Sequence, residues 1–128
     1  MAGEMAKLIY VMIGGSLGAL SRYGATLLAV RLFGPHFPWG TLFVNLVGCF
    51  FIGLSFALAE RTSFMSPSVR LFFVTGYLGA LTTFSTYAIE SVNAFTSEAY
   101  LTALANVLSN NLGGAGMVFL GLWLGRIL

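Results

Sequence analysis

Four continuous apolar runs dominate the sequence, and each is about as long as a helix that crosses a lipid bilayer. A spanning helix needs about 20 apolar residues, and the runs cover approximately residues 8–31, 38–60, 69–95 and 100–126. Only 8% of the residues are charged, whereas a soluble domain carries about a quarter. Lipid admits only helices and closed barrels, and the runs do not alternate as strands do. We therefore expect an all-α membrane protein, with residues 1–128 forming a single domain of four transmembrane helices.

Positive charges lie mostly on one side of this expected topology. With an even number of spans, the N-terminus, the second loop and the C-terminus share a side, which holds Lys7, Arg61, Arg70 and Arg126. The opposite side holds Arg31. The positive-inside rule then favours a multi-pass protein of the cell (inner or plasma) membrane with cytoplasmic termini. No basic cluster indicates binding of nucleic acid.

A cluster of hydroxyl groups lies in the middle of the third run, in the segment GALTTFSTY, residues 79–87. Its hydroxyl-bearing residues are Thr82, Thr83, Ser85, Thr86 and Tyr87. A regular helix would point some of them at lipid. We therefore expect a break in this helix, loosened by Gly76 and Gly79, which is tolerated only where it is buried in protein or lines a cavity. Carbonyl groups freed by such a break are suitable ligands for a cation such as sodium.

The first two runs also contain polar side chains. Arg22 is costly within a span, so it either pairs or reaches the interface, or it attracts an anion. Thr41 and Asn45 are four residues apart and share a helix face, where Asn45 either joins two helices or faces a polar path. Gly14 and Gly18 have the spacing that lets two membrane helices pack closely.

The fourth run carries a polar stripe. Asn106, Ser109 and Asn110 are spaced three and four residues apart and so lie on one helix face, while Asn111 lies off it. Three amides and a hydroxyl exceed what helix packing needs, which indicates a polar path through the membrane.

No span has a central Asp, Glu, His or Lys, so neither a proton-coupled carrier nor an enzyme is expected. The remaining groups are neutral hydrogen-bond donors and the positive edges of aromatic rings, which suit a small anion. Because four closely packed helices enclose little space, we expect the path to lie at the interface of a symmetric dimer.

The chain resembles the Fluc/CrcB family of bacterial fluoride channels. The similar stretches are GGSLGALSRY, GTLFVNLVGCFFIG, GYLGALTTFSTYAIE and ANVLSNNLGG with LGLWLG, and they cover all four runs in order. The resemblance implies a fluoride-selective channel that lets fluoride leave the cytoplasm passively. It also implies an antiparallel, dual-topology homodimer with two pores and a structural sodium ion at its centre.

The resemblance also assigns roles to residues. Sodium would bind the backbone carbonyls of Gly79 and Thr82 from both protomers, and Glu90 corresponds to the acidic residue that follows the break. Together with the polar pattern, it predicts a fluoride pore lined by Asn45, Phe84, Tyr87, Thr41, Ser85, Thr86, Asn106, Ser109, Asn110 and Arg22. Two positions depart from the family pattern: Tyr87 stands where phenylalanine is usual, and Asn110 stands in place of a serine.

Two other classes of membrane protein fit the length and hydropathy. A small multidrug transporter would need an acidic residue deep in the first helix, where this chain has Arg22 and no acid after Glu4. A non-transporting membrane subunit held by glycine packing would not explain the polar stripe in the fourth run or the hydroxyl cluster in the third.

Overall fold

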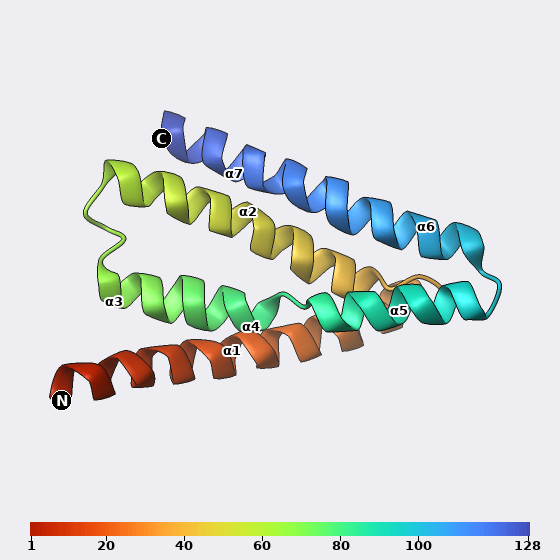
Figure 1. Cartoon of the computed structure of the whole chain (residues 1–128), viewed down its shortest axis with the longest axis horizontal. Coiled ribbons are helices and arrows are strands. Elements are labelled where there is room, and N and C mark those ends of the chain that lie inside the picture. The colour runs from red at the N-terminus through yellow and green to blue at the C-terminus, as the bar shows by residue number, and fades with distance from the viewer.

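The computed structural model describes residues 1–128 and contains only helices (Figure 1). The elements are α1 (Ala2–Phe33), α2 (Trp39–Arg61), α3 (Pro67–Val69), the π-helical segment η1 (Arg70–Leu78), α4 (Gly79–Leu81), α5 (Phe84–Thr96), α6 (Tyr100–Leu108), the π-helical segment η2 (Ser109–Gly113) and α7 (Gly114–Ile127). The segments α3, η1 and α4 run on as one rod that continues, after an interruption, into α5. The segments α6, η2 and α7 form another continuous rod. The expected all-α, four-helix architecture is therefore confirmed.

The four rods run up and down beside one another. Helix α1 packs along η1 and α4, α2 packs mainly along α7 and also contacts α1, and α5 packs on α6. The N-terminus, the connection between α2 and α3, and the C-terminus lie at the same end of the molecule (Figure 1). This arrangement agrees with the topology expected from an even number of spans.

Local signals in the sequence set the helix ends. Helix α1 ends at Phe33 and is followed by Gly34, whose φ of 79° is a conformation that glycine adopts without steric cost. Ser66 begins the third rod, because its hydroxyl accepts a hydrogen bond from the Val69 amide and Pro67 follows in the first turn. The observed ends differ from the expected ones by at most two residues, apart from the first helix, which begins six residues earlier at Ala2.

Glycine residues allow the rods to approach backbone to backbone. A Cβ atom added to Gly14 or Gly18 of α1 would overlap a backbone carbonyl oxygen of η1, that of Phe72 or Tyr77. On the other side of the bundle, a Cβ on Gly121 of α7 would overlap the Phe50 carbonyl oxygen of α2. The packing interpretation of the glycine pair in α1 is thus confirmed.

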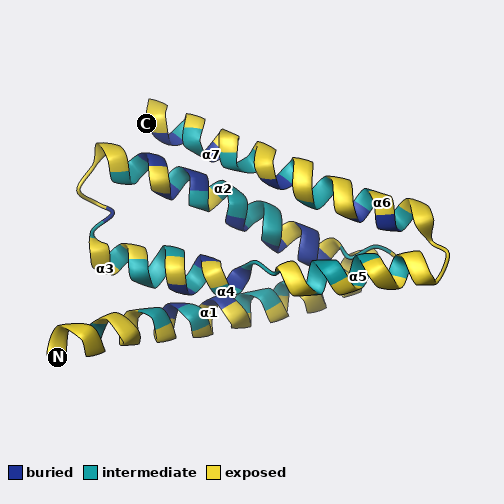
Figure 2. Ribbon diagram, viewed as in Figure 1, coloured by how far each residue is buried: buried dark blue, intermediate teal, exposed yellow.

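The outer surface of the bundle is largely apolar. Only 19 of the 128 residues are buried, and large hydrophobic side chains are exposed along every rod (Figure 2). Helix α2 and the rod Tyr100–Ile127 are each long and apolar enough to cross a membrane. The other two rods differ from these, because α1 contains Arg22 among glycine and serine residues and the third rod is interrupted. An apolar exterior of this extent fits a lipid environment and further protein contacts.

Candidate functional site

The third rod is interrupted at Thr82 and Thr83, as expected for this helix. Both residues have extended backbones, with φ and ψ of −81° and 155° for Thr82 and −149° and 118° for Thr83. The two glycines expected to loosen the helix, Gly76 and Gly79, do not form the interruption themselves, although Gly76 lies in the π-helical segment η1. Gly79 is helical, with φ −61° and ψ −34°, and Gly76 packs against the α1 backbone at Val11. The interruption therefore follows the glycines and begins at the threonines.

Asn45 of α2 holds the interruption in place. Its side-chain oxygen accepts a hydrogen bond from the Thr83 amide at 2.8 Å, and its Nδ2 donates to the Thr83 carbonyl at 3.1 Å. The amide group of Asn45 thus pairs with Thr83 as a neighbouring strand would. This contact satisfies two backbone groups that the helix no longer satisfies. Thr83 is also the N-cap of α5, because its hydroxyl accepts a hydrogen bond from the Thr86 amide.

The interruption also releases carbonyl groups from their usual helical donors. In a regular helix the Thr83 amide would donate to the Gly79 carbonyl, but here it donates to Asn45. The neighbouring Ala80 carbonyl accepts a hydrogen bond from Nε of Arg22 at 3.1 Å. Of the two interpretations of Arg22, the structure therefore supports pairing within the protein.

A chain of amide groups leads from α2 into the fourth rod. Asn45 Nδ2 donates to Asn110 Oδ1 at 2.9 Å, and Asn110 Nδ2 donates to Asn106 Oδ1 at 2.8 Å. Asn106 is only 1% exposed and donates to the Ser91 hydroxyl of α5 at 2.9 Å. Asn106 and Asn110 therefore share one face, as their spacing predicts. Ser109 is not part of this series of hydrogen-bonded amides, because its hydroxyl donates to the Ala105 carbonyl of its own helix at 2.6 Å.

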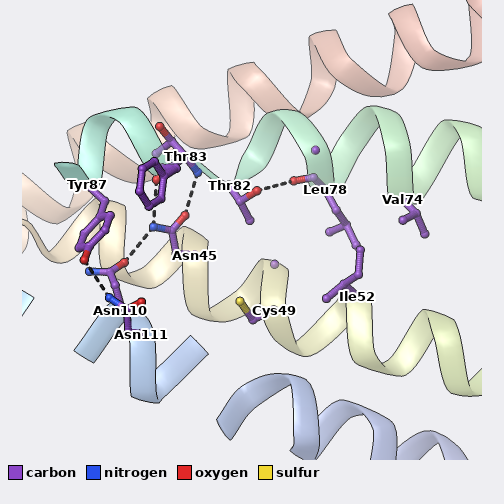
Figure 3. A pocket seen from close by; sticks show the side chains of 13 residues that line it. Asn45, Cys49, Ile52, Val74, Leu78, Thr82, Thr83, Tyr87, Asn110 and Asn111 are labelled. Atoms are coloured by element: carbon purple, nitrogen blue, oxygen red, sulfur yellow. Dashed lines mark hydrogen bonds between the residues drawn. The ribbon is translucent and has the colours of Figure 1, made fainter. Parts of the chain in front are cut away.

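These features surround an open cavity of about 340 Å³, which we name the central groove (Figure 3). Its lining brings together six of the predicted residues, namely Asn45, Gly79, Thr82, Phe84, Tyr87 and Asn110. The Phe84 side chain is 79% exposed, and its ring meets that of Tyr87 edge to face, with centroids 5.5 Å apart. The groove thus combines amides, a phenol and aromatic edges with the carbonyl end of α4.

A second cavity of about 430 Å³, which we name the end cavity, lies between the α1–α2 connection and α5. Buried Thr41 lines it and donates a hydrogen bond to Glu90 Oε1 at 2.5 Å. Thr86 also lines it. Because Thr41 and Asn45 are one turn apart on α2, the end cavity and the central groove lie along the same side of this helix.

Four predicted residues line neither cavity: Arg22, Ser85, Asn106 and Ser109. Ser85 is exposed on α5, in keeping with the spread of hydroxyl directions around that helix. Among the lining residues that the predicted pore set does not contain, Thr83 and Asn111 carry a hydroxyl and an amide group. The repeated hydroxyls of the TTFST segment were a signal for Thr83. No sequence signal indicated Asn111, because on a regular helix its side chain points away from the polar stripe of the fourth run.

The fold and this site define a helical membrane protein that encloses neutral polar groups between its helices. Residues 9–122 match the family model described as CrcB-like protein, Camphor Resistance (CrcB). The match spans most of the chain, and the chain belongs to this family. The resemblance inferred from the sequence motifs is confirmed.

Three relatives show how far the similarity extends, and each carries the name fluoride-specific ion channel FluC. The protein of Dehalococcoides mccartyi is 40% identical over 97% of this chain and 95% of its own length. That of Salinibacter ruber is 49% identical over 91% of this chain and 87% of its own length. That of Agrobacterium fabrum is 42% identical over 95% of this chain and 98% of its own length.

Proposed function

We propose that this chain forms a fluoride-selective channel of the cell membrane, through which fluoride leaves the cytoplasm passively and becomes less toxic to the cell. The observation that carries the proposal is the chemistry of the central groove. Every polar side chain that lines it is neutral, and the set combines amide groups from two rods with hydroxyl groups from α5 and the break. The near full-length similarity to relatives named fluoride-specific ion channels points to the same ion.

Neutral donors suit a small anion that must both enter and leave. A permeating ion has to be held strongly enough to lose its water, yet weakly enough to move on. A buried lysine would hold an anion too tightly, whereas amide and hydroxyl donors and aromatic ring edges supply weaker, directed contacts. Fluoride is compact and strongly hydrated, so such donors must reach it at close range.

The route would pass from the end cavity along α2 into the central groove. Thr41 lies at the start of this route, Asn45 in its middle, and Asn110 beside Asn45 on the fourth rod. Both Asn45 Nδ2 contacts are made to protein acceptors. An entering anion must therefore replace one of these acceptors. Exchange of one acceptor for another keeps the amide satisfied and holds down the cost of removing the ion from water.

One protomer cannot enclose the ion, because the groove is open and Phe84 stands on the surface. We include in the proposal an antiparallel homodimer in which a second copy covers this face, giving two pores. Apolar side chains exposed around the groove are suited to such an interface. Dual topology would place one pore in each orientation.

A structural sodium ion at the dimer centre also forms part of the proposal. The fit is favourable because the break deprives the Gly79 carbonyl of its helical donor and leaves Thr82 extended beside the groove. Backbone carbonyls of Gly79 and Thr82 from two copies would hold the ion. When bound, the cation would neutralise the partial negative charge of these carbonyls at the interface.

A flux assay tests the proposal. Purified protein in liposomes loaded with potassium fluoride should release fluoride to an external fluoride electrode when valinomycin carries the compensating potassium. The same vesicles loaded with chloride should release almost none. Equal passage of both ions would refute fluoride selectivity. Absence of any flux would favour a non-transporting subunit, and proton-coupled export of a cationic dye would favour a small multidrug transporter.

A further inference from the structure

We infer that the hydroxyl of Tyr87 donates a hydrogen bond to the anion in the central groove, and that Asn111 is the residue that orients it. The inference rests on the proposed function and adds two roles to it. Tyr87 would contact the ion directly. Asn111 would act through Tyr87 as a positioning residue.

The direction of one hydrogen bond carries the inference. Asn111 Nδ2 donates to Tyr87 Oη at 2.8 Å (Figure 3). An amide nitrogen can only donate, so the phenol oxygen is the acceptor in this contact. The proton of the phenol is then not used by Asn111. The Tyr87 hydroxyl donates no hydrogen bond to another group of this chain.

Asn111 is itself held firmly in place. The same Nδ2 atom also donates to the Val107 carbonyl one turn earlier, at 2.8 Å. Both amide protons of Asn111 are therefore committed, one to its own helix and one to Tyr87. A side chain anchored in this way fixes the position of the phenol oxygen and restricts the directions in which the phenol proton can point.

The π-helical segment η2 explains why two adjacent asparagines can both reach the groove. In a regular α-helix, neighbouring side chains are about 100° apart, which would turn Asn111 away from the stripe of Asn106 and Asn110. Both Asn110 and Asn111 lie in η2, where the wider turn changes the register of the side chains. Such π-helical turns are frequent at functional sites. Asn110 contacts Asn45, while Asn111 contacts Tyr87.

The chemistry of the phenol suits the proposed ion. A neutral O–H group forms short, strong hydrogen bonds to an anion and adds no charge that would trap it. Phenylalanine at the same position could offer only the weakly positive edge of its ring. The edge-to-face contact with Phe84 further restrains the Tyr87 ring. Tyr87 therefore adds a directed donor beside the ring edges.

The test measures initial fluoride efflux from liposomes as a function of fluoride concentration. At low fluoride, where the rate follows binding, Tyr87→Phe should be about tenfold slower than wild type, equivalent to about 1.4 kcal/mol of lost binding. The deficit should narrow as the concentration rises. A merely structural defect would lower the rate by the same factor at all concentrations. Tyr77→Phe is the matched control, because that hydroxyl donates to Ser21 outside the groove, and it should follow wild type.

Asn111→Leu should produce a deficit of the same kind, and the double variant with Tyr87→Phe should be no slower than Tyr87→Phe alone. Additive losses would overturn the role of Asn111, and a Tyr87→Phe variant with wild-type rates would overturn the inference as a whole. If wild-type protein passes no fluoride, the proposed function fails. If it passes fluoride and Tyr87→Phe does so equally, only the donor role of Tyr87 fails.

Discussion

Replacement of Asn45 by alanine should destabilise the fold, because this side chain substitutes for the missing helical partners at the break. The change removes three hydrogen bonds, at 2.8, 3.1 and 2.9 Å, to the Thr83 amide, the Thr83 carbonyl and Asn110. Each bond contributes about 0.5–1.5 kcal/mol net, so Asn45→Ala should lower the free energy of unfolding by about 2–4 kcal/mol. The lower end of this range corresponds to three bonds of about 0.6 kcal/mol each, which is the average measured for a hydrogen bond between membrane helices.

The assay is reversible unfolding in mixed micelles with increasing denaturing detergent, followed by helical circular dichroism. Asn93→Ala is the matched control, because Asn93 is exposed on α5 and its side chain makes no hydrogen bond within the protein. The control should stay within about 0.5 kcal/mol of wild type. If Asn45→Ala also stays within that limit, Asn45 does not hold the break, and the two extended threonines must be stabilised by something else.

Three further outcomes are expected from the same structure. Phe84→Ile should lower fluoride efflux several-fold while leaving unfolding nearly unchanged, because the ring is exposed and its edge would be lost; an unchanged flux would remove the Phe84 ring from the route. Gly121→Ala should destabilise the fold by about 1–3 kcal/mol through overlap with the Phe50 carbonyl, whereas Gly116→Ala, with open space around it, should be neutral or slightly stabilising in the same unfolding assay. Exchange of sodium for a large organic cation should increase the monomer fraction measured by single-molecule subunit capture in liposomes, and a dimer that persists equally in both media would argue against the proposed sodium site.

The helices were predictable from the sequence, because their formation depends on local hydropathy. Four long apolar runs became four rods, and Gly34 and Pro67 lie at rod ends as such residues usually do. The presence of a break was also predictable, because the hydroxyls around Thr82 and Thr83 could not all avoid lipid on a regular helix. These conclusions need only the composition of a segment and the solvent around it.

The position of the break was not predictable from the segment itself. Glycine usually weakens a helix, yet Gly76 lies within the helical segment η1 and packs closely against the α1 backbone. The extended residue Thr83 is stabilised by Asn45, which lies 38 positions earlier in the chain. A contact of that sequence separation leaves no trace in local periodicity.

Only the part of the candidate site that depends on regular helical spacing was predictable. The spacing of Asn106 and Asn110 placed both on one face, because three-to-four-residue spacing needs only a helix. The same rule wrongly separated Asn111 from them, since the π-helical turn η2 alters the angle between successive side chains. Whether the groove residues contact fluoride stays a prediction.

The break between Leu81 and Phe84 has an electrical consequence. Each helix carries a partial negative charge at its C-terminal end and a partial positive charge at its N-terminal end. The interruption therefore sets the negative pole of one helix and the positive pole of α5 only a few residues apart, at the centre of a bundle that contains few ionised side chains. A single change of backbone direction thus provides attraction for ions of both signs, and point substitutions of side chains cannot remove it while the two helix ends remain.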